Sequence, residues 1–221
     1  MSETDSQPPV CPVKAPDCSW LEELESLRQE NQLLSEHAHV DNLTGLYNQR
    51  YFTSSIQIEM ERTRRTGKPT SLIMLDLDRF KKLNDTWGHE NGNKALKQTA
   101  DLLHDSMRQL DIVCRYGGEE FIIILPATHL RQAVMVAERI RSSLDATPLV
   151  IDDQSIEVTA SFGVDSLHAS ELMSAADFVH SADSYLYKAK EAGRNQVCHP
   201  DFDSDEGRTE VSDDERKALF S

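Results

Sequence analysis

The chain has 221 residues, a net charge of −15 and 38% hydrophobic residues, which suits one folded domain of roughly 150–170 residues with flanking segments. The acidic balance argues against nucleic-acid binding through a basic surface. No apolar run approaches the roughly 20 residues of a membrane span and no signal-peptide core is present, so we expect a soluble, cytoplasmic protein without membrane attachment.

The first 40 residues divide into two parts. Residues 1–18 are rich in proline and polar residues, which predicts disorder. Over residues 19–40 apolar residues recur at alternating spacings of four and three, as in the heptads of a coiled coil. The seam consists of Trp20, Leu24, Leu27, Asn31, Leu34 and Ala38. We predict a helical stalk that forms a dimeric coiled coil, and the alternative is an amphipathic helix packed on its own domain.

Helical and strand-like patterns alternate through residues 41–199. The predicted helices span residues 48–65, 80–85, 94–109, 130–144 and 171–191. The predicted strands span residues 71–77, 112–115, 120–125, 149–151, 155–164 and 197–198. Strands separated by helices indicate an α+β domain, an α/β sandwich in which helices cover a central sheet. Residues 200–221 are predicted to be an acidic, disordered tail.

The stretch from Arg115 to Phe121 reads Arg-Tyr-Gly-Gly-Glu-Glu-Phe and joins two apolar runs. It predicts a hairpin whose tip carries two adjacent carboxylates, Glu119 and Glu120. Adjacent carboxylates resist joint ionisation unless a cation neutralises them, and glycines let a bulky group approach the backbone. The pattern favours a divalent metal beside a phosphate, and the alternative is a hairpin turn with solvated glutamates.

Charged residues near other element ends complete the candidate site. Asp76 and Asp78 end a predicted strand on one face, where they could join the hairpin acids around Mg²⁺. We assign Asp76 to metal and leave Asp78 open between metal binding and capping of the next helix. Lys81, Lys190 and Arg194 are candidate phosphate ligands, although the last two also suit the C-terminus of a helix.

A series of motifs, in order and with matching spacing, resembles the GGDEF family of diguanylate cyclases, here with Gly-Gly-Glu-Glu-Phe as the signature. The motifs are Asp41–Asn48, Asp76–Lys81, Asn84-Asp85, Gly88-His89, Arg115–Phe121, Ser161–Gly163 and Tyr187–Asn195. The resemblance implies a mostly antiparallel sheet wrapped by helices, similar to the palm of nucleotide polymerases. It also implies a reaction that joins two GTP into cyclic di-GMP and two pyrophosphates, with one GTP held by each subunit of a homodimer.

The resemblance also implies roles by position. Glu119 is the expected catalytic residue, which accepts the 3′-hydroxyl proton. Two Mg²⁺ ions per active site, or Mn²⁺, are expected on Asp76, the Leu77 carbonyl, Glu119 and Glu120. Substrate contacts are expected from Phe80, Lys81, Asn84, His89, Asn93, Gly118, Lys190 and Arg194. An inhibitory product site is expected at Arg108, Asp111 and Arg139, with Arg139 as the half that the partner subunit supplies. Spacing alone would instead make Arg108 and Asp111 a surface ion pair.

One departure from the family pattern concerns base choice. Asn93 stands where the family usually has an aspartate, and an asparagine offers guanine one acceptor where an aspartate offers two. Losing one hydrogen bond to a buried donor costs about 1–3 kcal/mol, so guanine selectivity would weaken by roughly ten- to a hundredfold. A relaxed cyclase that also makes cyclic GMP–AMP or cyclic di-AMP is therefore one alternative.

Two further hypotheses concern regulation. An inactive domain could bind cyclic di-GMP and signal through the coiled coil, although the intact acids Asp76, Glu119 and Glu120 argue against this. The sequence names no input signal, so we expect a regulatory protein to bind the N-terminal stalk. A higher oligomer formed with the product would also fit the expected inhibitory site.

Overall fold

The computed structural model describes residues 23, 24, 26–28 and 39–202. The chain divides into two compact units, residues 1–39 and 40–221. In the first unit, the described residues 23, 24 and 26–28 are helical. The rest of the predicted stalk up to residue 38, the segment 1–18 and the tail from residue 203 lie outside the described residues. The coiled coil and the disordered ends therefore stay predictions.

The second unit is built on a six-stranded sheet with the order β1-β3-β4-β2-β7-β8. The strands are β1 (Tyr47–Asn48), β2 (Thr70–Leu77), β3 (Ile112–Gly117), β4 (Glu120–Leu125), β7 (Ala160–Leu167) and β8 (Val197–Cys198). The four longer strands form antiparallel pairs, whereas the two-residue edge strands β1 and β8 pair in parallel. The mixed fold with a mainly antiparallel sheet is thus confirmed. The edge strand β1 was not predicted, because two residues are too short to show a pattern.

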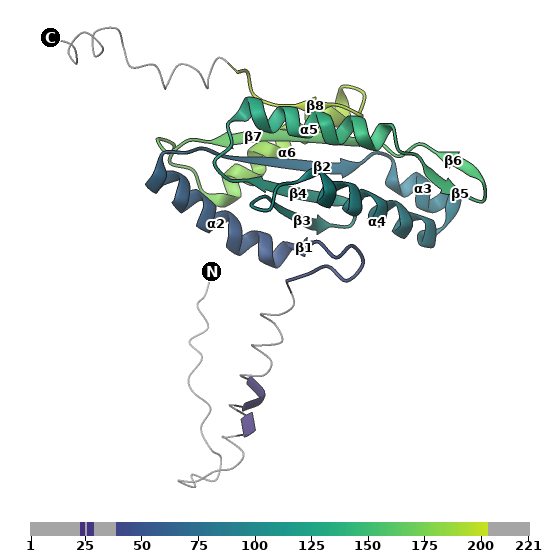
Figure 1. Cartoon of the computed structure of the whole chain (residues 1–221), viewed down its shortest axis with the longest axis horizontal. Helices are drawn as coiled ribbons and strands as arrows, with labels where there is room; N and C mark the ends of the chain where they lie inside the picture. The colour runs from purple at the N-terminus through teal and green to yellow at the C-terminus, as the bar shows by residue number, and fades with distance from the viewer. Residues whose placement is uncertain (1–22, 25, 29–38, 203–221) are drawn as a thin grey trace, which may run out of the picture. The chain divides into compact units, whose positions relative to one another are not determined.

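Helices cover both faces of this sheet (Figure 1). Helices α2 (Gln49–Thr66) and α6 (Ala175–Glu191) pack on one face, and α3 (Phe80–Trp87), α4 (His89–Ser106) and α5 (Leu130–Asp145) pack on the other. Alternate residues of β2 serve the two cores, so that Leu72 and Met74 face α2 and α6 while Ile73 and Leu75 face the opposite layer. Because both faces are covered, the central strands are continuous apolar runs.

The strand predicted over residues 155–164 is divided between two sheets. Its first part belongs to β6 (Gln154–Ile156), which pairs with β5 (Leu149–Ile151) in a separate two-stranded sheet. Its second part begins β7 at Ala160, opposite Leu77 of β2. Apolar content alone cannot show the division, because Val158 between the two strands is also buried.

The helix predicted over residues 94–109 begins five residues earlier, because helix α4 spans His89–Ser106. Gly88 alone separates α3 from α4, and its φ of 81° allows the sharp change of direction. A side chain at Gly92 would meet Asn84, since a Cβ there would lie 1.8 Å from Asn84 Oδ1. Gly92 is therefore needed for close packing of two consecutive helices.

The last helix was predicted to begin at Glu171, but α6 begins at Ala175. Ser174 is its N-cap and forms a capping box with Asp177, in which Ser174 Oγ accepts the Asp177 N–H at 3.1 Å. The helix ends at Glu191, with Ala192 as the C-cap and Gly193 following at a φ of 121°. The cap residues explain both ends of this helix.

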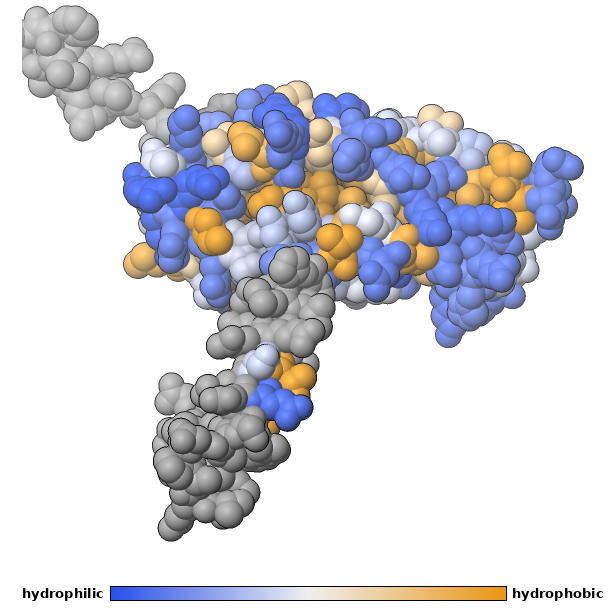
Figure 2. Space-filling view, turned by 60° about the horizontal axis from the view of Figure 1, so that its bottom comes forward, coloured by the Kyte–Doolittle hydropathy of each residue, from blue (hydrophilic) through white to orange (hydrophobic). Residues whose placement is uncertain are grey.

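Figure 2 shows a largely hydrophilic face on which hydrophobic residues form separate patches. The exposed large hydrophobic residues among those described include Leu110, Val150 and Leu172, which lie in different parts of the chain. Of the helices in the described part of the chain, none has the length and apolar character needed to cross a membrane.

Candidate active site

The predicted acidic residues lie where β2 and β4 run side by side. Asp76 is directly opposite Glu120 in the antiparallel register, and its neighbour on the other side is Ser161 of β7. The Leu77 N–H donates to the Glu119 carbonyl at 3.3 Å. The Gly118–Glu119 turn therefore lies beside the end of β2, and two strand ends bring carboxylates together as the sequence predicted.

The charges of this cluster are partly balanced by helix α6. Lys190 Nζ lies 2.9 Å from Asp76 Oδ2. Burial raises the pKa of Asp76, while the ion pair with Lys190 opposes this rise. Burial also raises the pKa of Glu120, and the negative charge of Asp76 adds to it. The pair of carboxylates thus provides more negative charge than one ammonium group compensates.

Asp76 and Glu120 are the candidate ligands of a divalent cation at this site. Within the described residues, no three His, Cys, Asp or Glu side chains are close enough to form a preformed cage. Asp76 and Glu120 nevertheless supply facing carboxylates, which are the hard oxygen donors that Mg²⁺ prefers. Since Asp76 already pairs with an ammonium group, this position suits positive charge. The residues fit Mg²⁺ or Mn²⁺, with the Leu77 carbonyl and the Glu119 side chain as further predicted ligands.

A loop and the start of helix α3 lie next to the carboxylates. Arg79 precedes α3 with a φ of 56°, and no side chain caps this helix end. Uncapped N–H groups at a helix start are suited to bind phosphate. A pocket of about 410 Å³ borders this loop and is also lined by Arg194. Of the predicted contacts here, Phe80 is buried and Lys81 is exposed.

The predicted base and ribose contacts lie on α3 and α4. Asn84 is half-buried, and its Oδ1 atom is buried without a hydrogen-bond partner within the described part of the chain. This atom faces the backbone of Gly92, since a Cβ there would lie 1.8 Å from it. His89 and Asn93 are exposed in the first two turns of α4. Of these three predicted contacts, Asn84 therefore lies between the two helices, whereas His89 and Asn93 lie at the surface.

The predicted product site forms one cluster within the chain. The Arg108 N–H donates to Asp111 Oδ2 at 2.9 Å, so a backbone group holds the carboxylate. Burial raises the pKa of Asp111, while this hydrogen bond and the charges of Arg108 and Arg139 oppose the rise. Arg139 Nη2 donates to the Ser106 carbonyl at 2.8 Å. Arg139, which was predicted as the half of the site supplied by a partner, lies beside Arg108 and Asp111 of its own chain.

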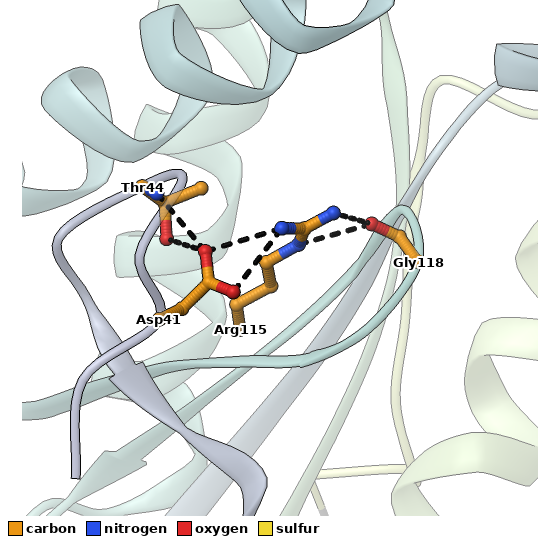
Figure 3. A network of polar contacts seen from close by, with 4 residues as sticks. All are labelled: Asp41, Thr44, Arg115 and Gly118. Carbon is orange, nitrogen blue, oxygen red and sulfur yellow. Dashed lines mark hydrogen bonds and ion pairs between the residues drawn. The ribbon is translucent and has the colours of Figure 1, made fainter. Parts of the chain in front are cut away.

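An ion-pair network that the sequence did not predict supports the hairpin turn (Figure 3). Arg115 Nη1 lies 3.1 Å from Asp41 Oδ1, while Arg115 Nη2 and Nε donate to the Gly118 carbonyl at 2.8 and 3.1 Å. Asp41 also accepts the N–H and hydroxyl of Thr44 at 2.9 and 2.7 Å. Although burial opposes it, these hydrogen bonds and the Arg115 charge lower the pKa of Asp41. The first turn of the domain is thereby tied to the Gly-Gly turn.

Asp78 does not cap helix α3, which was one of the two roles left open from the sequence. Arg79 and not Asp78 precedes α3, and no side chain caps that helix. The Asp78 carboxylate instead accepts the hydroxyl groups of Ser161 and Thr159 and the N–H of Asn195. A carboxylate that connects three distant segments is not visible in sequence spacing.

Comparison with known proteins agrees with these features. Residues 38–196 match the family described as diguanylate cyclase, GGDEF domain. The response regulator PleD of Caulobacter vibrioides is 41% identical over 164 residues, which cover 73% of this chain and 36% of that protein. The chain thus spans about a third of the length of this curated relative.

Two solved structures have similar folds. The diguanylate cyclase SiaD of Pseudomonas aeruginosa, in complex with its activator SiaC, has a TM-score of 0.71 and 36% identity over 81% of this chain and 68% of that one. The coiled coil and GGDEF domain of DgcB from Caulobacter crescentus, in complex with c-di-GMP, has a TM-score of 0.71 and 28% identity over 81% of this chain and 94% of that one. From the family match over most of its length, together with the carboxylates beside the Gly-Gly turn, the chain belongs to the GGDEF family of diguanylate cyclase domains.

Proposed function

We propose that this protein condenses two GTP into cyclic di-GMP and two pyrophosphates. The observation that carries the proposal is the facing pair Asp76 and Glu120, which lies beside the Gly-Gly turn with Lys190 Nζ 2.9 Å from Asp76. The similarity to relatives named as diguanylate cyclases, at 35–37% identity, supports the same activity.

In this reaction, Asp76, Glu120, the Glu119 side chain and the Leu77 carbonyl would hold Mg²⁺ or Mn²⁺. The bound ions would supply neutralisation of the phosphate charge and activation of a hydroxyl group. Lys190, whose ammonium group contacts Asp76, would donate a hydrogen bond to a phosphate oxygen near the same ions. Glu119 would accept the proton of the attacking 3′-hydroxyl. Lys81 and Arg194 would add positive charge near the other end of the triphosphate.

The base would be bound between α3 and α4. The Asn84 amide, whose Oδ1 atom has no hydrogen-bond partner where it faces Gly92, would turn to accept guanine N–H groups. Asn93 supports a second candidate activity, because an amide can pair with either guanine or adenine. We therefore include mixed cyclic GMP–AMP or cyclic di-AMP as products of the same site. His89 would contact the ribose, and Gly118 would allow close approach of the phosphates.

The reaction needs two subunits, because each domain would bring one GTP. A homodimer formed through the stalk would align the two nucleotides, so that dimer geometry sets the rate. The cluster of Arg108, Asp111 and Arg139 offers two guanidinium groups around one carboxylate, which suits the guanine edge and phosphates of cyclic di-GMP. We propose that product bound there inhibits the enzyme, in a dimer or a higher oligomer.

A regulatory protein is proposed to act through the N-terminal stalk. The support is the neighbour SiaD, whose structure was determined with its activator SiaC. Binding of a partner to the stalk would change the dimer geometry without touching the nucleotide site. Rates measured at several protein concentrations, with and without residues 1–39, would test the contribution of this segment.

The decisive experiment incubates the full chain with GTP, with ATP and with both, in Mg²⁺, and separates the products by chromatography. We expect cyclic di-GMP from GTP alone and a fraction of mixed dinucleotide from the mixture. Glu119→Gln should abolish product, whereas the exposed control Asp101→Asn should not. Absence of pyrophosphate release from the wild-type chain at every protein concentration would refute the activity, and pure cyclic di-GMP from the mixture would refute relaxed base choice.

A further inference from the structure

The hydrogen bonds of the Asp78 carboxylate have no part in the metal and nucleotide binding proposed for the residues around it. The carboxylate accepts Ser161 Oγ at 2.6 Å through Oδ1, and Thr159 Oγ1 at 2.8 Å through Oδ2. Oδ2 also accepts the N–H of Asn195 at 3.0 Å, and the Asp78 N–H donates to the Thr159 carbonyl at 2.8 Å. Both carboxylate oxygens of Asp78 thus accept hydrogen bonds from the protein. These bonds connect the loop after β2 with β7 and with the turn after α6.

The turn after α6 is a conformation that needs support. Arg194 and Asn195 have φ values of 68° and 44°, in the left-handed region that residues other than glycine rarely adopt. Such a conformation persists only when surrounding contacts hold it. The Arg194 N–H donates to the Ala189 carbonyl at 3.0 Å, and Arg141 Nη1 donates to Asn195 Oδ1 at 3.0 Å. The carboxylate of Asp78 supports the same turn from the side of the active site, because it accepts the Asn195 N–H.

This turn carries a charge that acts on the site. Arg194 is exposed, lines the pocket beside the β2–α3 loop and contributes positive charge to the environment of Asp76. Lys190, in the last turn of α6, precedes this turn and contacts Asp76 directly. The direction of the Arg194 side chain depends on the backbone conformation of this turn, to which Asp78 is hydrogen-bonded at Asn195.

We propose that Asp78 is a positioning residue that fixes the turn after α6, and thereby holds Arg194 where it can bind the phosphates of the nucleotide. This inference rests on the proposed function. In this proposal Asp78, the second aspartate of the Asp76-Leu-Asp78 sequence, neither binds metal nor caps a helix.

Asparagine at position 78 separates positioning from metal binding. Its carbonyl can accept the Asn195 N–H and the Thr159 hydroxyl, while its amide donates to Ser161, whose hydroxyl can turn to accept. Asp78→Asn should therefore keep the turn, whereas Asp78→Ala leaves the Asn195 N–H without its partner. A metal ligand would behave differently, because loss of the negative charge in either variant would weaken Mg²⁺ binding.

The experiment measures binding of a non-hydrolysable GTP analogue by calorimetry, with the Mg²⁺ concentration at half-saturation as a second readout. We expect Asp78→Ala to weaken analogue binding by about tenfold or more, and Asp78→Asn by no more than about threefold. The Mg²⁺ half-saturation should be unchanged in Asp78→Asn. The exposed carboxylate variant Asp101→Ala serves as the control. Equal losses in Asp78→Asn and Asp78→Ala, or a shifted Mg²⁺ requirement in Asp78→Asn, would overturn the proposal.

A double-mutant cycle tests whether Asp78 acts through Arg194. In an Arg194→Gln background, Asp78→Ala should add little further loss of binding, and full additivity would contradict the proposal. If thermal melting shows that Asp78→Ala is unfolded, Thr159→Val removes one hydroxyl donor with less disturbance and should show the same dependence on Arg194. Failure of the wild-type chain to bind the analogue would instead refute the proposed function. Normal binding by the wild type and by Asp78→Ala alike would refute only the positioning role.

Discussion

Replacing Arg115 by methionine should destabilise the domain through the network that joins its first turn to the Gly-Gly turn. The side chains of Arg115 and Asp41 are 17% and 23% exposed, so their ion pair is partly shielded from water. The lost contact with Asp41 should cost about 2 kcal/mol, and the lost bonds to the Gly118 carbonyl about 1 kcal/mol more. The total of about 3 kcal/mol corresponds to a fall in Tm of about 6–12 °C. Calorimetry of Arg115→Met beside the exposed control Lys97→Met measures this loss.

The pH dependence of the same variant gives a second test. The pKa of Asp41 is lowered in the folded state, so its contribution to stability is present above its unfolded value of about 3.9. That contribution is lost as the pH falls through the folded pKa. Since Arg115 is one cause of the lowered pKa, the stability difference between wild type and Arg115→Met should shrink on acidification. A loss below about 1 kcal/mol at pH 7, or a difference that stays constant down to pH 3, would refute this account.

Three further outcomes follow from close contacts and burial. Gly163→Ala should destabilise the domain by about 3 kcal/mol or more, measured by urea unfolding, because a Cβ would lie 2.1 Å from the Ala182 carbonyl oxygen; wild-type stability would contradict the packing of β7 on α6. Gly92→Ala should displace Asn84 and reduce the free energy of binding of a GTP analogue by more than it reduces the free energy of unfolding. Unchanged binding would exclude Asn84 from the base site. Cys114, whose pKa burial raises to about 12, should resist iodoacetamide at pH 8 until the protein unfolds, and rapid labelling of the folded protein in peptide mapping would contradict its burial.

Several parts of the site were predictable from sequence because they depend on short-range patterns. The apolar run that ends in Asp76 predicts a strand with a carboxylate at its end, and two glycines before Glu119 and Glu120 predict a hairpin tip. Period-two alternation of side chains then limits which faces these residues can occupy. The helices α2 and α5 were likewise visible, because each has a continuous amphipathic pattern between turn residues.

Other parts depend on contacts between segments that are distant in the chain. The start of α4 was missed because Gly88 and Gly92 indicate a loop, whereas packing against Asn84 makes glycine necessary inside a helix. The division of β6 from β7 was missed because an apolar run does not tell which strand it pairs with. In both cases tertiary packing overrode the local preference.

The sequence by itself therefore determined that carboxylates end a strand and follow a Gly-Gly turn, because these features are encoded by adjacent residues. Only the tertiary structure decided that Asp76 faces Glu120, that Arg115 ties the hairpin turn to Asp41, and that Asp78 holds the turn at Asn195. The physical reason is that register and hydrogen-bond partners depend on how β2, β4, β7 and α6 are packed, and that arrangement minimises the free energy of the whole domain rather than of any one segment.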